Sequence, residues 1–254
     1  MILDDFSLAG RTALVTGAAR GLGQGYALAL AEAGADVALL DRSDCSQTAA
    51  QVRALGRRAT AIEADLSQTA QAEIDGIVAL VVAELGRLDI LINNAGIIRR
   101  QPAVQHSADN WNDVLTVNLD AVFFLSQAAG REMIAQGGGK IVNIASMLSY
   151  QGGILVPSYT AAKHAVAGLT KALANEWAAL GVNVNAIAPG YMATDNTAPI
   201  RADADREASI STRIPAGRWG LPRDLAGAVV FLASPASDYV HGAIIPVDGG
   251  WLTR

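Results

Sequence analysis

Short apolar runs alternate with longer amphipathic stretches along the whole chain. The apolar runs are rich in Val, Ile, Leu and Ala and contain few alternating polar residues, which is typical of parallel strands covered on both faces. They predict strands over residues 12–16, 36–40, 59–63, 89–92, 140–145, 183–187 and 243–247, and the longer stretches predict helices over 22–33, 47–55, 70–85, 108–136, 159–180 and 223–233. The helix over 108–136 is long enough to contain a break. This alternation predicts an α/β fold: a Rossmann-like, doubly wound parallel sheet of about seven strands with helices on both faces.

No repeat, low-complexity block or linker divides the chain, so residues 1–254 are predicted to form a single domain. A hydrophobic content of 51% is sufficient for one large core. The least regular region, 194–219, is polar, contains prolines and follows the sixth predicted strand. Ligands of open α/β sheets bind outside the carboxyl ends of the strands, so this region is predicted to be a mobile substrate lid. The alternative is an ordinary pair of surface helices.

The charge pattern argues against several classes of partner. The formal net charge is −5 and no basic run occurs, whereas a nucleic-acid site needs a clustered positive stripe. No stretch reaches the roughly 18 apolar residues of a membrane helix, and the N-terminal residues lack a secretory pattern. The one cysteine, Cys45, excludes an internal disulfide and favours a reducing compartment. We therefore expect a cytoplasmic protein without nucleic-acid or membrane partners, whose abundant small residues suit subunit interfaces.

A glycine-rich turn, TGAARGLG from residue 16, joins the first predicted strand to the first predicted helix. Glycines permit a tight turn and let backbone N–H groups approach a pyrophosphate, which the positive N-terminus of the helix then attracts. Asp41 ends the second predicted strand, where a carboxylate accepts hydrogen bonds from adenosine ribose hydroxyls. The pattern predicts a dinucleotide site that includes Gly17, Arg20, Gly21, Leu22, Gly23 and Asp41.

Asp41 also bears on which dinucleotide binds. A carboxylate at this position repels a 2′-phosphate and so favours NAD over NADP. Arg20 and Arg42 are the opposing signals, because either guanidinium could pair with that phosphate. NAD is therefore the expected cofactor and NADP the alternative.

The glycine spacing TGxxxGxG resembles the short-chain dehydrogenase/reductase family, and further motifs typical of that family follow in order. They are Asp65-Leu66, the NNAG turn at 93–96, Asn118, Ser146, YTAAK at 159–163, PGYMAT at 189–194 and VDGGW at 247–251. The resemblance covers essentially the whole chain. It implies cofactor contacts from Asp65, Leu66, Asn93, Ala95, Gly96, Tyr159, Lys163, Pro189, Gly190 and Thr194, and a catalytic set of Asn118, Ser146, Tyr159 and Lys163.

The chemistry of these residues explains why they occur together. Tyr159 and Lys163 are four residues apart and would share one helical face. A free phenol has a pKa of about 10, and a nearby ammonium together with the positive nicotinamide ring would lower it. Tyr159 could then take the proton of a substrate hydroxyl, with Ser146 orienting the reacting oxygen. The resemblance further implies that Lys163 holds the nicotinamide ribose and that Asn118 positions a water.

Several stretches resemble bacterial members of the family that oxidise deoxy sugar acids with NAD and are typically homotetramers. A sugar acid needs a cation for its carboxylate, and Arg99, after the NNAG turn, is the candidate, with Arg100, Arg201 and Arg213 as alternatives. The other predicted substrate contacts are Ser146, Gln151, Tyr159 and Tyr191, with Met147 and Met192 as pocket walls.

Three other functions remain open. The first two are a dehydrogenase of another polyol or sugar and a 3-oxoacyl reductase, and Asp41 argues against the second because such reductases normally prefer NADPH. The third is a non-catalytic nucleotide sensor, which would keep the glycine turn but lose the tyrosine or the lysine. His106, His164 and His241 show no metal-ligand spacing, so a metal-free mechanism is expected.

Overall fold

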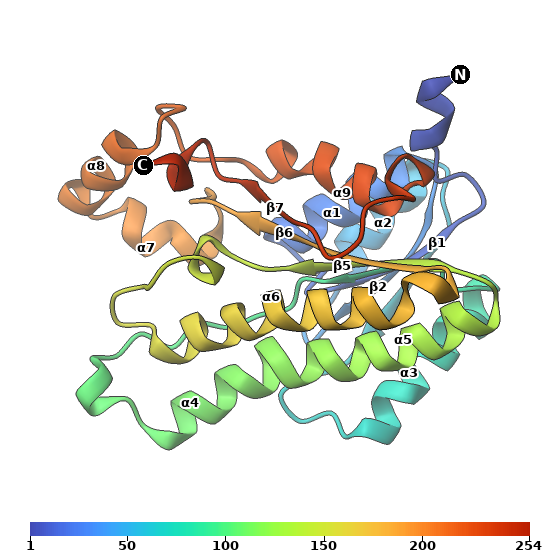
Figure 1. Ribbon diagram of the computed structural model, residues 1–254, viewed down its shortest axis with the longest axis horizontal. Helices are drawn as coiled ribbons and strands as arrows, with labels where there is room; N and C mark the ends of the chain where they lie inside the picture. Colours follow the sequence, from blue (N-terminus) through green and yellow to red (C-terminus); the bar gives the residue numbers. More distant parts are fainter.

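Seven parallel strands form one sheet in the computed structural model, which describes residues 1–254 apart from the Asn196 side chain (Figure 1). They are β1 (Thr12–Thr16), β2 (Asp36–Asp41), β3 (Ala59–Glu63), β4 (Ile90–Asn93), β5 (Gly139–Ile144), β6 (Val182–Pro189) and β7 (Ile244–Val247), in the order β3-β2-β1-β4-β5-β6-β7. Every residue of β1, β4 and β6 is buried, which explains why their sequences are mostly apolar. The predicted fold is confirmed, and the strand bounds agree within one or two residues.

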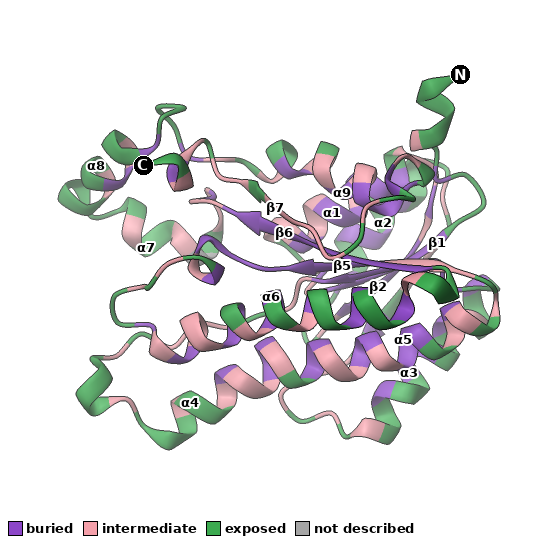
Figure 2. Ribbon diagram, in the orientation of Figure 1, coloured by how far each residue is buried: buried purple, intermediate pink, exposed green. Residues whose placement is uncertain are grey.

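Helices cover both faces of the sheet. One face carries α1 (Gly21–Glu32), α2 (Ser46–Ala54) and α9 (Ala226–Ala233), and the other carries α3 (Gln71–Leu85), α4 (Ala108–Leu115), α5 (Ala121–Ala135) and α6 (Pro157–Trp177). Figure 2 shows the buried residues concentrated in the strands and on the helix sides that face them. The strand order reverses between β1 and β4, and in such sheets a ligand crevice forms at the reversal, outside the carboxyl ends of the strands.

A π-helical turn, Thr116–Asp120, joins α4 to α5. The break expected within residues 108–136 is therefore a local widening of a continuous helical path. Such turns are rare and occur frequently at functional sites. Here the turn contains Asn118, which is completely buried.

The polar segment after β6 folds into two short helices, α7 (Ala198–Arg201) and α8 (Ala204–Arg213), beyond the carboxyl edge of the sheet (Figure 1). Ile210 and Ile214 attach α8 to a small apolar cluster that also contains Met147, Trp219 and Trp251. The segment is a helix pair, and its motion as a lid stays a prediction. Over the described residues, no helix has the length and apolar character needed to cross a membrane.

Candidate active site

A cleft of about 840 Å³ runs along the carboxyl edge of the sheet, from the glycine-rich turn to α8. Seven Lys and Arg residues line it against four Asp, although the whole chain has a net charge of −5. The cleft is thus a positive region of an acidic protein, which favours anionic ligands.

Close backbone contacts hold the glycine-rich turn. A Cβ on Gly23 would lie 1.9 Å from the Gly17 carbonyl oxygen, and Gly17 itself has a φ of +66°. Asn94 Nδ2 donates to the Thr16 carbonyl oxygen at 2.8 Å, and Thr16 Oγ1 accepts from the backbone N–H of Asn94 at 2.9 Å and of Ala95 at 2.8 Å. Side chains are therefore excluded where the backbone enters α1, and a pyrophosphate can approach the helix N-terminus.

The cleft near β2 is lined by the three charged residues that bear on the choice of dinucleotide, Asp41, Arg42 and Arg20. The Asp41 carboxylate accepts hydrogen bonds from the backbone N–H groups of Ala19 at 3.1 Å and Ser43 at 2.9 Å, which fixes its orientation. Arg42 is exposed beside it. Arg20 lies 3.9 Å from Asp195, so one carboxylate already faces it.

Asp65 and Leu66 follow β3 and line the same end of the cleft. Asp65 accepts hydrogen bonds from the Ser67 backbone N–H at 2.9 Å and from its hydroxyl at 2.7 Å. These bonds, helped by the charge of Arg42, lower the pKa of Asp65. A carboxylate and an apolar side chain thus lie next to each other at this end of the cleft.

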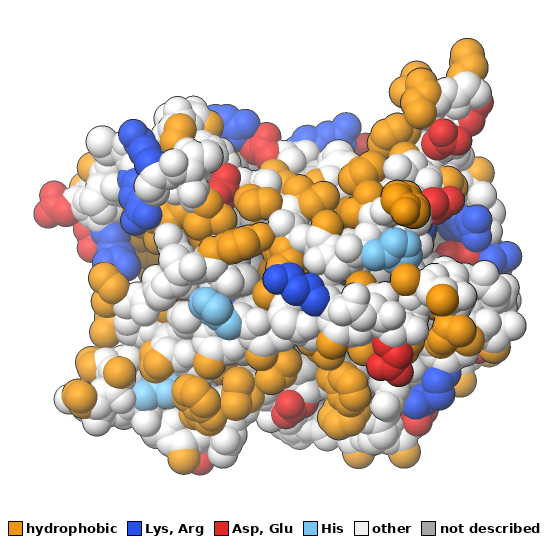
Figure 3. Space-filling view, viewed as in Figure 1, with side chains coloured by type: hydrophobic (Ala, Val, Ile, Leu, Met, Phe, Trp, Pro, Cys, Tyr) orange, Lys and Arg blue, Asp and Glu red, His pale blue; other side chains and the backbone are white. Residues whose placement is uncertain are grey.

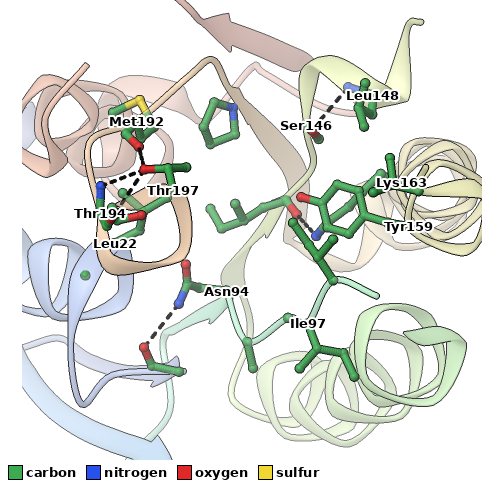
Figure 4. Close-up of a pocket in the computed structure, with 18 of the residues that line it drawn as sticks. Leu22, Asn94, Ile97, Ser146, Leu148, Tyr159, Lys163, Met192, Thr194 and Thr197 are labelled. Carbon is green, nitrogen blue, oxygen red and sulfur yellow. Dashed lines mark hydrogen bonds between the residues drawn. The ribbon is translucent and has the colours of Figure 1, made fainter. Parts of the chain in front are cut away.

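Tyr159, Lys163 and Ser146 lie together on one wall of the cleft (Figure 4). Tyr159 and Lys163 come from the first two turns of α6, which begins with Pro157. Lys163 is 4% exposed, and its Nζ donates to the Ile144 carbonyl oxygen at 2.6 Å and lies 5.6 Å from the Tyr159 ring centroid. Ser146 follows β5, and its Oγ accepts from the Leu148 backbone N–H at 3.1 Å.

The pKa of Tyr159 is raised in the protein without cofactor, and its lowering beside the nicotinamide ring stays a prediction. Burial raises it, and this outweighs the lowering by a hydrogen bond with Ser146 and by the charge of Arg100. Burial also lowers the pKa of Lys163 to about 8. Lys163 directs its ammonium to a backbone carbonyl, so it contributes less to the phenol than its position four residues away suggested.

Three residues predicted for the site do not line the cleft: Asn93, Asn118 and Gln151. Asn93 points into the interior, where its Nδ2 donates to Ser126 Oγ and Asn143 Oδ1, both at 2.9 Å. Its neighbour Asn94, the first residue after β4, lines the cleft instead and is held there by its hydrogen bonds to Thr16.

Asn118 acts on the cleft wall through another residue. Its Oδ1 accepts from the Ile97 backbone N–H at 2.8 Å and its Nδ2 donates to the Ile97 carbonyl oxygen at 2.9 Å. Ile97 lines the cleft opposite Met192 and Thr194 (Figure 4). The buried amide therefore fixes the backbone of the loop after β4.

The loops and α8 form the far end of the cleft, where the predicted Arg99 and Tyr191 both line the wall. Arg99 pairs with Asp113 at 3.1 Å. Tyr191 packs edge-on against Trp219 and Trp251, with ring centroids 5.2 and 4.8 Å away.

Sequence reasoning assigned no role to several residues that line this end, including Arg206, Ser209, Ile210 and Trp251. Residues 206, 209, 210 and 213 follow the i, i+3, i+4, i+7 spacing of one helical face, and this was a signal available in the sequence. Among the described residues, no group of three or more His, Cys, Asp or Glu could hold a metal ion.

Comparisons with known proteins agree with this geometry. A family model described as enoyl-(acyl carrier protein) reductase matches residues 17–252. The 2-dehydro-3-deoxy-D-gluconate 5-dehydrogenase of Escherichia coli K12 is 59% identical, with 100% of both chains covered, and that of Bacillus subtilis 168 is 57% identical, with 99% of this chain and 98% of the relative covered. A crystal structure from Agrobacterium tumefaciens, provisionally named 2-deoxy-D-gluconate 3-dehydrogenase and containing NADP, has a TM-score of 0.91 at 54% identity, covering 99% of this chain and 100% of that one.

Proposed function

The chain belongs to the short-chain dehydrogenase/reductase family of oxidoreductases, and from this premise we propose that it interconverts 2-dehydro-3-deoxy-D-gluconate and 3-deoxy-D-glycero-2,5-hexodiulosonate with NAD(H). The observation that carries the proposal is the joint placement of Ser146, Tyr159 and Lys163 in a positively charged cleft next to the glycine-rich turn. Full-length relatives that share this activity in their names support the choice of substrate. The substrate class is a gluconate-like sugar acid, and within that class we propose the deoxy-keto acid named above.

The residues present fit a nicotinamide dinucleotide, which supplies a hydride acceptor or donor when bound. The turn that a Cβ on Gly23 would block is suited to the pyrophosphate, and the positive cleft suits its charge. The residues proposed to hold the cofactor are Gly17, Arg20, Gly21, Leu22, Gly23, Asp41, Arg42, Asp65, Leu66, Ala95, Gly96, Tyr159, Lys163, Pro189, Gly190 and Thr194, all of which line the cleft.

NAD is the proposed cofactor because the Asp41 carboxylate is held in place by two backbone N–H groups. It can accept hydrogen bonds from ribose hydroxyls and repels a 2′-phosphate at the same position. The similar structure with bound NADP shows that related clefts accept the phosphate. Arg42, exposed beside Asp41, is the residue of this chain that could pair with it.

In the proposed reaction Tyr159 moves the proton. When the alcohol is oxidised, the Tyr159 phenolate accepts the hydroxyl proton, and when the ketone is reduced, the Tyr159 phenol donates it back to the oxygen. Ser146 hydrogen-bonds the reacting oxygen and orients it. The positive charge of Arg100 favours the phenolate and opposes the burial that raises the pKa of Tyr159.

Asn118 is proposed as a positioning residue. Its two hydrogen bonds to the Ile97 backbone fix the position of the loop that carries Arg99 and Arg100. Arg99 is a weaker candidate for the substrate carboxylate than the sequence suggested, because Asp113 already neutralises it. Tyr191 remains a proposed hydroxyl partner, and Gln151 does not, because it lies outside the lining.

The quaternary state and compartment are proposals of the same kind. We expect a homotetramer, as the resemblance to tetrameric members of the family implies, and the exposed side chains of Trp111 and Leu180 are available for subunit contacts. Sedimentation equilibrium would test this assembly. The cytoplasm is the proposed compartment, in keeping with a single free cysteine.

Initial rates of NADH and NADPH oxidation with 3-deoxy-D-glycero-2,5-hexodiulosonate test the function. We expect fast turnover with NADH and at least about 10-fold lower kcat/KM with NADPH. Asp41→Asn should shift this ratio toward NADPH, whereas Asp44→Asn, which removes an exposed carboxylate outside the cleft lining, should leave it unchanged. Turnover with neither cofactor would refute the substrate, and a preference for NADPH would assign the decisive role to Arg42.

A further inference from the structure

We propose that Arg213 and the indole N–H of Trp251 form the subsite for the substrate carboxylate, where α8 and the turn after β7 line the cleft. This inference rests on the proposed function for the identity of the acid. The subsite itself follows from two side chains that line the cleft, Arg213 and Trp251, whose hydrogen-bond donors have no acceptor in the described structure.

Arg213 is held in place and its charge is not neutralised. Its guanidinium carbon lies 3.9 Å from the centroid of the Trp251 ring, a stacked cation–π arrangement. No Asp or Glu of the described residues lies within 4.0 Å of it, unlike Arg99 and Arg20. Arg254 Nη2 donates to the Arg213 carbonyl oxygen at 2.9 Å, so the last residue of the chain fixes the backbone there. A stacked guanidinium with free N–H groups is suited to bidentate binding of a carboxylate.

Trp251 supplies the second donor. It is 4% exposed and lines the cleft, yet its Nε1–H has no hydrogen-bond partner. By contrast, Trp219 Nε1 in the same apolar cluster donates to Ser211 Oγ at 3.0 Å and to Glu207 Oε1 at 3.2 Å. A buried donor without a partner costs free energy, and nearly all such groups in native proteins have one. A carboxylate oxygen is the acceptor that would satisfy both Trp251 and Arg213.

The rest of the wall restricts where Trp251 can lie. Asp248 accepts from the backbone N–H groups of Gly250 at 2.8 Å and Leu252 at 2.9 Å, which fixes the turn that carries the tryptophan. The Tyr191 ring lies edge-on to the indole, at 4.8 Å between centroids. The two donors therefore belong to one rigid wall, whereas an isolated surface arginine would be free to turn into solvent.

The other arginines of the cleft suit this role less well. Arg99 is paired with Asp113. Arg100 is close enough to Tyr159 for its charge to lower the phenol pKa, so it lies at the reacting end of the substrate. In the proposed substrate the carboxyl carbon is four carbon–carbon bonds from the reacting carbon, which calls for a cation further from Tyr159. Arg206 also lines the cleft from α8 and, like Arg213, is exposed, but no aromatic ring stacks on its guanidinium.

Kinetics with a charged and an uncharged substrate provide the first test. The 2,5-diketo acid and its methyl ester are compared in the wild type, Arg213→Gln, Arg213→Lys and Trp251→Phe. We expect Arg213→Gln to lower kcat/KM for the acid about 10- to 100-fold, mainly through KM, because a charged hydrogen-bonded pair is lost. The kcat/KM for the ester should change by less than about 2-fold. Arg213→Lys should retain only part of the kcat/KM for the acid. Trp251→Phe, which keeps an aromatic ring for stacking but has no N–H, should lower this value less than Arg213→Gln does.

Arg223→Gln is the matched control, because Arg223 is exposed, pairs with Glu32 and does not line the cleft. It should leave both kcat/KM values unchanged. An unchanged NAD dissociation constant and melting temperature in Arg213→Gln would show that the variant is folded. An equal loss for the acid and the ester in Arg213→Gln, or no loss for either, would overturn the subsite.

A binding measurement decides the proposal even if the wild type turns over neither substrate, an outcome that would refute the proposed function alone. In protein labelled with ¹⁵N-tryptophan, Trp251→Phe identifies one indole signal among four tryptophans. Titration with D-gluconate should shift this signal in the wild type and not in Arg213→Gln, and D-glucitol, which has the same carbon chain without a carboxylate, should not shift it. An equal response to both compounds, or no response to gluconate, would overturn the subsite.

Discussion

The two ends of the cleft are built in different ways. At the end near β1 and β2, backbone groups shape the site. Gly23 leaves no room for a Cβ in the turn, and the backbone N–H groups of Ala19 and Ser43 hold the Asp41 carboxylate. At the end near α8, side chains form the surface, and Arg213, Tyr191 and Trp251 come from three separate segments. Figure 3 shows positively charged side chains gathered over the α7 and α8 region, beyond the sheet.

This difference indicates which changes each end tolerates. A surface made of backbone keeps its shape when side chains are exchanged, but a single added methyl group can block it. A surface made of side chains can change its ligand by substitution without disturbing the sheet, because α8 is attached by its own small apolar cluster. Substitutions at the first end should therefore affect cofactor binding and folding together, and those at the second should affect the substrate alone.

The largest expected effect tests the chemical step separately from cofactor binding and substrate binding. Tyr159→Phe removes the phenol hydroxyl and keeps the ring, so kcat should fall about 10²- to 10⁴-fold, the usual contribution of a general acid–base group. The NADH dissociation constant, measured by fluorescence titration, should change by less than about 2-fold. Tyr239→Phe, on a fully exposed side chain, is the matched control and should keep full activity. Substantial turnover in Tyr159→Phe would show that another group moves the proton.

A change at the backbone-built end should affect cofactor binding and stability together. Gly23→Ala places a Cβ 1.9 Å from the Gly17 carbonyl oxygen, and the turn must move to accommodate it. We expect a loss of about 1–3 kcal/mol of stability, as for overpacking, and at least about 10-fold weaker NADH binding. Gly76→Ala is the control: it lies in α3 with nothing within 4 Å of the added Cβ. It should stabilise the protein by about 0.5–1 kcal/mol, and denaturant unfolding would measure both. Unchanged NADH binding in Gly23→Ala would show that the turn does not contact the pyrophosphate.

The same contrast explains how much could be read from the sequence. The sheet, its helices and the glycine turn follow from local patterns, because apolar runs, strand ends and glycines act through their immediate neighbours. The placement of Tyr159 and Lys163 on one wall also follows, since four residues on a helix bring side chains to one face.

The substrate end could be predicted only in part, since its contacts depend on tertiary pairing. The sequence suggested Arg99 for the carboxylate, but the pairing of Arg99 with Asp113, fourteen residues away, becomes visible only in the structure. Asn93 and Asn94 are equivalent in the motif, and only the strand geometry shows which one faces the cleft. The stacking of Arg213 on Trp251 joins residues that no local spacing connects.

The smallest expected effect concerns Lys163, which lies between the two ends. Burial lowers the pKa of its ammonium to about 8, below the ordinary value of 10.5. Lys163 therefore binds fewer protons in the folded protein than in the unfolded chain between about pH 8 and 10.5, and in this window its contribution to the free energy of unfolding should rise with pH. The destabilisation is complete below pH 8 and disappears above 10.5. In protein with ¹³C-labelled lysine, one of three signals should titrate near pH 8 and be absent from Lys163→Met. The difference in the free energy of unfolding between the wild type and Lys163→Met should change across this window by the contribution of Lys163. A midpoint near 10.5 would show that the ammonium keeps its water and that the cleft wall around Ile144 is open to solvent.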